Sequence, residues 1–370
     1  MFPFKMILRG TNEAVSYFLL PQRVGAVYDF LHSDDGLRAA EPTYSGRWGP
    51  GFKIFQKNLI NEGSKLQFKV NLGLRYRQRY QLKFERVHLF GSVVNNEFLL
   101  SYTLQPDESF FGIGPNTSED DRTNFLHERA YAQVGLGRML SERVEMSTSF
   151  SFEQNNIRGG KHPDYESITE AYNLTKLPGL ESKLRMLGIG LALRYDSRNS
   201  IGRPTSGTEI MLSGGVFDQI KKDHYRYWKV NADVRQYLHL FFRRAVMFRL
   251  AGEMTESLSD GAVPFYHLSE LGRSETIRGF SRGRFRDRDM LLGSVEYYYP
   301  IWQGRDNGVD AFLFVDAGQV ANNIMEDFNP DDLQVGFGGG LRFSGELSES
   351  VRVMVAKSKE GFRFYLDLNL

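Results

Sequence analysis

The chain has 370 residues, and its 46 basic and 45 acidic side chains leave a formal net charge of only +1. Such an even balance gives no overall attraction to nucleic acid, and we expect no nucleic-acid partner. Cysteine is absent, which excludes disulfides, thiolate metal sites and thiol catalysis. The 29 Phe, 18 Tyr and 37 Gly together with a modest mean hydropathy are typical of strands in which apolar and polar residues alternate.

The N-terminal segment, residues 1–40, carries a short apolar patch that Arg9 and Gly10 interrupt, unlike the longer apolar stretch of a secretory signal. A first strand is plausible within 14–31. We expect residues 41–370 to form one further domain, because no second pattern appears along the chain. No apolar run approaches the roughly 18 residues that a membrane-spanning helix needs.

From residue 65 onward, apolar and polar side chains alternate with a period of two. In 65–76 the even positions include Leu66, Phe68 and Val70, whereas the odd positions are mostly charged or polar, and the pattern continues to Phe84. The same alternation recurs in residues 187–196, 228–235, 334–343 and 362–370. A period of two over eight or more residues predicts β-strands, since helices repeat every three to four residues.

The length of these runs distinguishes a membrane barrel from a soluble all-β protein. Soluble strands are typically about 5–6 residues long, whereas membrane-spanning strands need roughly 9–11. Aromatic residues also gather at strand ends, as in Glu296–Pro300 and Ser109–Phe111. With about 15 strand candidates from residue 47 and one in 14–31, we predict an all-β fold: a closed antiparallel transmembrane β-barrel of about 16 strands. A soluble all-β protein is the alternative.

The connections differ in length. Long polar segments lie at 105–124, 155–183 and 255–288, and short ones at 140–142, 240–243 and 358–361. This asymmetry predicts long extracellular loops and short periplasmic turns.

The last long segment contains Gly279-Phe280-Ser281-Arg282-Gly283, which matches the G-x-S-x-G elbow of serine hydrolases. Such an elbow needs a buried strand before the serine and a helix after it. Neither is predicted here, and no histidine follows Ser281 in the chain. A serine hydrolase therefore stays a remote alternative, and we expect no enzymatic activity, no cofactor and no metal site.

The same segment resembles the BamA/TamA-like superfamily of outer-membrane assembly factors, the bacterial surface-antigen barrels. The motifs that carry the resemblance are Ile277–Phe280, Gly293-x-x-Glu296-Tyr297, Phe314-x-Asp316-x-Gly318 and Gly338-x-Gly340-Leu341-Arg342. Two weaker similarities are Phe110–Thr117 and Asp196–Asn199 with Pro204 and Gly207. The resemblance covers roughly residues 40–370. It implies that the arginine–glycine–aromatic tip belongs to the sixth extracellular loop, which folds into the lumen, and that a glutamate and an aspartate of the inner wall hold the arginine.

Alternation supports this placement independently. Val295 and Tyr297 share the apolar face of their strand, which turns Glu296 toward the lumen, and Asp316 is turned inward in the same way. Both carboxylates can then bind an inserted Arg278 through charge-assisted hydrogen bonds. We name these residues, with the glycines and aromatic residue beside them, the lumen latch: Arg278, Gly279, Phe280, Glu296, Asp316 and Gly318.

A basic stripe occupies alternate positions in the first third of the chain: Arg75, Arg77, Arg79 and Lys83. Tyr76 and Tyr80 lie on the opposite face, so bases cannot stack beside phosphate contacts. We interpret the stripe as part of a charged lumen wall.

The resemblance also implies a function. We expect an integral barrel in the outer membrane of Gram-negative-type cells that takes part in inserting, assembling or exporting envelope proteins, in contact with lipids and with protein partners. The seam between the first and last strands, with Phe362, Phe364, Leu366 and Leu368 on the last one, is expected to open sideways. A porin or a passive scaffold within an envelope complex is the alternative.

Two features depart from the family pattern. The chain has no room before residue 47 for the periplasmic polypeptide-transport-associated domains that usually precede such barrels, so we expect them to be lacking. Its last residue is Leu370 instead of an aromatic residue.

Overall fold

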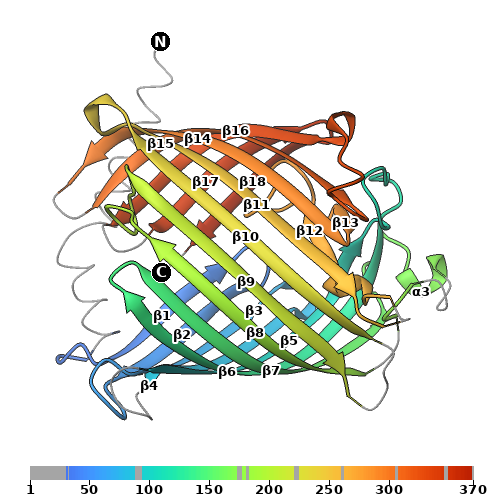
Figure 1. Ribbon diagram of the computed structural model, residues 1–370, viewed down its shortest axis with the longest axis horizontal. Coiled ribbons are helices and arrows are strands. Elements are labelled where there is room, and N and C mark those ends of the chain that lie inside the picture. Colours follow the sequence, from blue (N-terminus) through green and yellow to red (C-terminus); the bar gives the residue numbers. More distant parts are fainter. Residues whose placement is uncertain are drawn as a thin grey trace.

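The computed structural model describes residues 31, 33–87, 94–172, 177–180, 183–220, 225–259, 262–304, 307–345 and 349–368. Sixteen antiparallel strands form one sheet, in which each strand pairs with the next along the chain, and this sheet curves into a barrel (Figure 1). The prediction of an all-β antiparallel barrel of about 16 strands is confirmed. Among the described residues, no helix has the length and apolar character needed to cross a membrane.

The strands of the barrel are β1 (Arg38–Ser45), β2 (Gly49–Lys57), β3 (Lys65–Leu72), β4 (Gln78–Val87), β5 (Asn95–Phe110), β6 (Thr123–Ser141), β7 (Val144–Gly159), β8 (Leu184–Asp196), β9 (Gly207–Gln219), β10 (Arg226–His239), β11 (Ala245–Ser257), β14 (Asp289–Gln303), β15 (Asn307–Ala321), β16 (Gln334–Gly345), β17 (Glu349–Ser358) and β18 (Gly361–Leu368). Two further strands, β12 (Ser269–Leu271) and β13 (Phe285–Asp287), pair with each other inside the loop between β11 and β14. The short helical elements are α3 (Ile168–Ala171), η1 (Leu74–Tyr76), η2 (Phe241–Arg243), η3 (Phe265–His267) and η4 (Pro330–Asp332).

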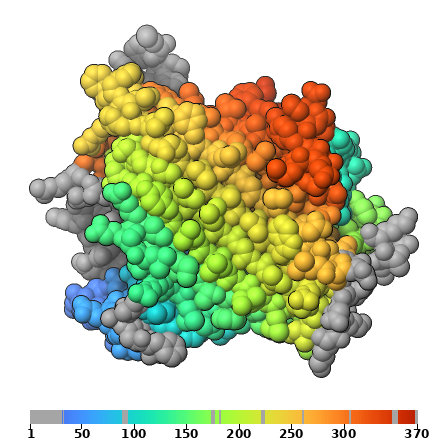
Figure 2. All heavy atoms as spheres, viewed as in Figure 1, coloured from blue at the N-terminus to red at the C-terminus, as the bar shows by residue number. Residues whose placement is uncertain are grey.

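The outer surface of the barrel is apolar, and many of its inner positions are polar. Cross-strand partners extend an apolar row around the outside, from Ile54 to Phe68 to Leu82 to Leu100, and all four side chains are exposed. Figure 2 shows one side of this wall as a continuous surface over the green and yellow strands. Charged side chains such as Asp316 are instead buried inside. A soluble protein would bury its apolar side chains and expose its charged ones. An apolar outer surface around a polar interior is instead typical of a barrel that lies in a lipid bilayer.

The first strands differ from the prediction in position and length. β1 begins at Arg38, so it crosses the expected boundary between 1–40 and 41–370, whereas 14–31 lies outside the described residues except for residue 31. The alternating run 65–84 is two strands, β3 and β4, joined by a turn at 73–77. Position 70 pairs with position 80, so odd and even residues keep their faces across the turn, and alternation alone does not reveal the reversal.

The long connections lie together at one end of the barrel, because each strand reverses the chain direction. The segments 111–122, 160–183 and 258–288 all follow strands that run toward this end. Figure 1 shows α3, β12 and β13 toward it. The turn at 359–360 also lies at this end, since β17 runs the same way as β5, β7 and β11. Its assignment to the short-turn end was wrong, because length alone does not give strand direction.

The two ends of the sheet meet at a seam between β1 and β18. Among the described residues no hydrogen-bonded ladder joins these strands. They approach where a Cβ on Gly46 would lie 3.9 Å from the Leu366 carbonyl oxygen. Gly46 follows the end of β1, and Leu366 lies near the end of β18. Because the two strands are antiparallel, they overlap only over the last few residues of each. Phe362 and Phe364, near the start of β18, are 72% and 67% exposed. The side chain of Leu368 lies outside what the structure describes.

Candidate functional site: the lumen latch and the inner wall

The loop between β11 and β14 enters the lumen and packs against the inner wall. Its short sheet, β12 with β13, gives it a rigid core. Buried apolar side chains from the loop and from three wall strands form one cluster: Ala251, Leu271, Ile277, Phe280, Phe285, Leu292 and Val320. The Phe280 ring meets the Phe285 ring edge-on, with centroids 5.2 Å apart. This packing fixes the position of the loop tip against β11, β14 and β15.

Arg278 is at the tip and is 3% exposed. Its Nε donates to Asp316 Oδ2 at 2.7 Å and its Nη2 to Asp316 Oδ1 at 2.5 Å, which makes a bidentate pair. The Nη1 atom donates to Glu296 Oε1 at 2.5 Å, and the backbone N–H of Arg278 donates to Asp316 Oδ2 at 3.0 Å. The guanidinium also lies 3.6 Å from the ring centroid of Phe314. The carboxylates of Asp316 and Glu296 on the inner wall therefore balance the positive charge of Arg278.

The two carboxylates have further partners that hold them in place. Ser294 Oγ donates to Asp316 Oδ1 at 2.8 Å, and the Tyr298 hydroxyl donates to Glu296. The Arg352 guanidinium lies 3.7 Å from Glu296 Oε1. Two guanidiniums thus face two carboxylates, and the buried cluster is close to neutral. Such a balance is required, since an unpaired charge away from water is costly.

The residues after Arg278 bind the last two strands. The N–H of Gly279 donates to the Tyr365 hydroxyl at 2.9 Å, and its carbonyl accepts from Ser358 Oγ at 2.7 Å. Gly279 has a φ of 97°, a conformation that favours glycine, and Arg363 Nε donates to its carbonyl at 3.2 Å. The tip therefore connects β14 and β15 with β17 and β18, on one side of the seam.

Gly318 and Gly336 provide the space that the tip occupies. A Cβ on Gly318 would lie 2.6 Å from the Leu291 carbonyl oxygen and 3.0 Å from Ile277 Cδ1. A Cβ on Gly336 would lie 1.8 Å from the Arg278 carbonyl oxygen. Gly318 was expected in the latch, and Gly336 was not. Only the register of β15 with β16, which pairs Asp316 with Gly336, places it beside the arginine.

The model of the Omp85 superfamily domain matches residues 58–347, which is most of the chain. The chain belongs to the Omp85 superfamily. It is therefore a multi-strand barrel of the Gram-negative outer membrane, and the resemblance to BamA/TamA-like barrels is confirmed. Omp85 barrels act in the assembly or export of outer-membrane proteins, together with partner proteins and lipids.

Solved structures share this fold at low sequence identity. BamA from Haemophilus ducreyi lacking POTRA domains 1–3 aligns with a TM-score of 0.62 and 15% identity over 89% of this chain and 67% of that one. CdiB from Acinetobacter baumannii aligns with a TM-score of 0.52 and 14% identity, and CdiB from Escherichia coli with 0.52 and 12%. These alignments cover 90% and 89% of this chain but only 59% and 60% of the CdiB chains. No curated protein sequence matches the chain.

Two arginines next to the latch were not predicted as site residues. Arg284 Nε donates to Glu360 Oε1 at 2.7 Å, and its Nη atoms donate to Thr117 Oγ1 at 2.8 Å and to the Thr117 carbonyl at 2.6 Å. Arg286 pairs with Glu270 and donates to the Phe265 carbonyl at 3.0 Å. Both are almost fully buried. The alternate arginines of the run 282–288 are a signal that could have indicated them.

Thr117 ends one of the two weaker family motifs, and the second motif also has a local structural role. Asn199 accepts the N–H groups of Thr205 and Ser206. Gly207 has a φ of 103°, and a Cβ there would lie 2.3 Å from the Ser197 carbonyl oxygen. The motif thus builds the turn between β8 and β9.

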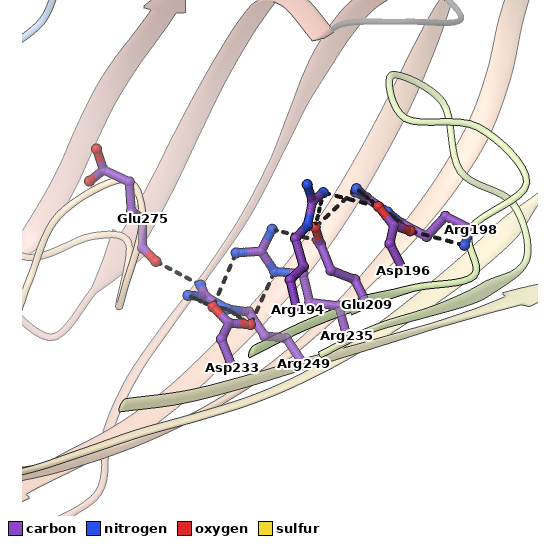
Figure 3. A network of polar contacts seen from close by, with 8 residues as sticks. All are labelled: Arg194, Asp196, Arg198, Glu209, Asp233, Arg235, Arg249 and Glu275. Carbon is purple, nitrogen blue, oxygen red and sulfur yellow. Dashed lines mark hydrogen bonds and ion pairs between the residues drawn. The ribbon is translucent and has the colours of Figure 1, made fainter. Parts of the chain in front are cut away.

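The inner wall from β8 to β11 carries a network of charges (Figure 3). Arg194 and Arg198 each approach Glu209 Oε1 at 2.9 Å. Further along the wall, Arg235 and Arg249 share Asp233. Arg249 Nη1 then donates to the Glu275 carbonyl of the loop at 2.7 Å. Paired charges thus run along the wall from β8 to the loop that carries the latch.

The predicted basic stripe divides into three parts. Arg75 and Arg77 both pair with Asp107, at 3.2 and 2.8 Å, beside the turn after β3. Lys83 pairs with Glu85 at 2.5 Å and Glu97 at 3.1 Å. Arg79 lines two lumen cavities. The four residues do not form one continuous surface, because the turn at 73–77 separates Arg75 from the strand.

The elbow setting that a hydrolase requires does not occur at Ser281. The residue lies between β12 and β13, in a segment that returns to a strand and not to a helix. Among the described residues, the side chain of Ser281 has no hydrogen bond to a histidine. Nor does any group of three or more His, Asp or Glu side chains in the described ranges lie suitably for a metal ion.

Proposed function

We propose that this barrel takes part in inserting, assembling or exporting envelope proteins by opening the seam between β1 and β18 toward the lipid. The observation that supports this proposal is the lack of a ladder between these strands in the described residues. A strand edge without a partner offers free N–H and C=O groups to which an incoming strand can add. The contact at Gly46 and Leu366 involves only the ends of β1 and β18, so we expect the two strands to separate there without unfolding of the wall.

The latch contributes by bracing one side of the seam. Its bonds to Asp316, Ser358 and Tyr365 fasten the loop tip to β15, β17 and β18, whereas β1 has no hydrogen bond to the tip in the described residues. Movement at the seam then displaces β1 against a fixed β18. Partner proteins of the envelope would deliver client chains to this edge.

An engineered disulfide tests the seam. The chain has no cysteine, so Gly46→Cys with Leu366→Cys creates the sole pair. The control pair is Val355→Cys with Phe364→Cys, which are partners inside the ladder of β17 and β18. In cells that depend on this chain, quantitative mass spectrometry measures the outer-membrane proteins with and without reductant.

We expect the seam disulfide to lower the amounts of assembled envelope proteins reversibly, and the control disulfide to leave them unchanged. Unchanged amounts with a fully formed seam disulfide would contradict the proposal. Disulfide formation is read from the shift in gel migration before and after reduction.

A porin or passive scaffold is the second candidate, and the polar lumen favours it. A cavity of about 490 Å³ lies in the lumen beside β6, β7, β8 and β9, lined largely by glycine, serine and charged residues. Single-channel conductance in planar bilayers, combined with normal envelope composition when the seam is closed, would support a porin. Purification from native membranes in mild detergent, with mass spectrometry of co-eluting proteins, distinguishes a subunit of a complex from a barrel that works alone.

A further inference from the structure

A second lumen cavity lies between the seam and the loop tip, and it has a volume of about 800 Å³. Residues 44–47, at and just after the end of β1, and residues 364–367 of β18 form one side of it, and Arg278 and Phe280 of the tip form another. The cavity is thus bounded by both edges of the seam and by the latch.

The lining of this cavity is strongly basic. Nine basic side chains line it, against three acidic ones, Glu275, Glu296 and Asp367. The basic residues are Arg47, Lys69, Arg79, Arg235, Arg249, Arg273, Arg278, Arg282 and Arg352. Most of them bind carboxylates at or near the wall, as Arg278 binds Asp316 and Arg47 binds Glu108.

Three of the nine cations have no such partner. In the part of the chain that the structure describes, the side chains of Lys69, Arg79 and Arg282 make neither a hydrogen bond nor an ion pair. All three are partly buried. A basic side chain without a counter-charge in a confined and partly dehydrated space raises the free energy of the protein.

Two of these cations lie side by side on neighbouring strands. Lys69 pairs in register with Gln81, and Arg79 pairs with Asn71, so Lys69 and Arg79 are diagonal neighbours on one face. Such positions are about 7–8 Å apart at the backbone, within reach of long side chains. Lys53 lies directly opposite Lys69, and its ammonium is already bound by Glu41. Lys69 and Arg79 therefore repel each other without compensation.

Arg282 approaches the same cavity from the loop. Burial and the charges of Arg47 and Arg273 lower the pKa of Arg282, although Glu275 and Glu270 act in the opposite direction. Glu270 is paired with Arg286, and Glu275 lies 3.7 Å from Arg273. Arg47, which also lines the cavity, lies near both Arg79 and Arg282. Uncompensated positive charge thus reaches the cavity from the strands and from the loop.

We propose that this cavity binds a phosphate group, either in a lipid headgroup or as free phosphate. A phosphomonoester carries about −1.5 to −2 charge at neutral pH and three strong acceptor oxygens. It can therefore satisfy several convergent cations, whereas a single carboxylate neutralises only one. The position beside the seam gives such a group a route from either lipid or water. This inference does not depend on the proposed role in assembly.

Calorimetric titration of the purified full-length chain in a non-ionic detergent tests the site. The probes are inorganic phosphate and a short-chain phosphatidic acid. A short polyglutamate tests whether the cavity binds the carboxylates of an acidic peptide instead. We expect saturable binding of a phosphate probe, weakened at least tenfold in Lys69→Gln/Arg79→Gln and also weakened in Arg282→Gln. Arg138→Gln is the matched control, because Arg138 is exposed on β6 and does not line the cavity.

The variants are expected to fold, since removal of mutually repelling cations relieves strain. Unchanged heat-modifiable gel migration checks this. Tighter binding of phosphatidic acid than of phosphate supports a lipid source, and equal binding supports free phosphate. Lack of saturable binding, an equal loss in Arg138→Gln, or binding of polyglutamate alone would each overturn the proposal.

Discussion

The carbonyl oxygen of Arg278 lies 1.8 Å from the point where a Cβ on Gly336 would stand. β16 therefore passes the loop tip at a distance that only glycine allows. The neighbouring partner in the ladder, Asp316, is the residue that holds the arginine from the side. One cross-strand pair thus provides both the charge that binds the tip and the space that admits it.

Gly336→Ala is expected to displace the loop tip. The neighbour is a backbone atom that cannot rotate away, so the cost is about 1–3 kcal/mol, as for overpacking of a core. Thermal unfolding, followed by heat-modifiable gel migration, measures it. Gly252→Ala is the matched control, because a Cβ there would lie 3.6 Å from its nearest neighbour. Equal unfolding temperatures for the two variants would show that the tip does not depend on this contact.

Arg278→Ala is expected to destabilise the barrel by about 3–5 kcal/mol, because it leaves Asp316 and Glu296 buried without their cation. Arg278→Lys restores the charge but not the bidentate geometry, and should recover only part of the loss. Equilibrium unfolding in urea measures both. The double variant Arg278→Ala/Asp316→Asn should lose less than the sum of the single variants. Strict additivity would mean that the two side chains are not coupled.

Arg284→Ala is expected to loosen two connections at once. Arg284 binds Thr117 in the segment after β5 and Glu360 in the turn before β18. Limited proteolysis should therefore cut both 111–122 and 359–360 faster in the variant. Arg288→Ala is the comparison: its partner Glu256 is half exposed, and such surface pairs contribute little. Similar cleavage rates in the two variants would argue against the bridge.

Ser281→Ala should leave both unfolding temperature and envelope composition close to those of the unaltered chain. Ser358→Ala should lower the unfolding temperature, because Ser358 Oγ donates to the Gly279 carbonyl at the latch. The loss expected is about 1 kcal/mol, the usual net contribution of one such hydrogen bond. A general esterase assay on both variants adds a readout for the hydrolase alternative. Activity that disappears only in Ser281→Ala would revive it.

Much of the fold was predictable, because alternation with a period of two follows directly from strand geometry. Apolar residues such as Phe68 and Leu313 face outward, and Glu296 and Asp316 face inward, as the order of residues predicts. The prediction of the Arg278 tip had a different basis, because it came from a family resemblance.

What the sequence alone determined is therefore which face of each strand meets lipid, because side chains on successive strand residues point to opposite sides. Tertiary structure decided the rest. Only the register of β15 with β16 brings Gly336 to Arg278, and only the loop's path into the lumen brings Arg284 to Thr117, 167 residues away. Alternation did not reveal the hairpin of β3 and β4, because odd and even residues keep their faces across its turn. The seam arises from the stagger of β1 against β18. Such contacts depend on how the strands of a barrel are staggered, a property of all its strands together.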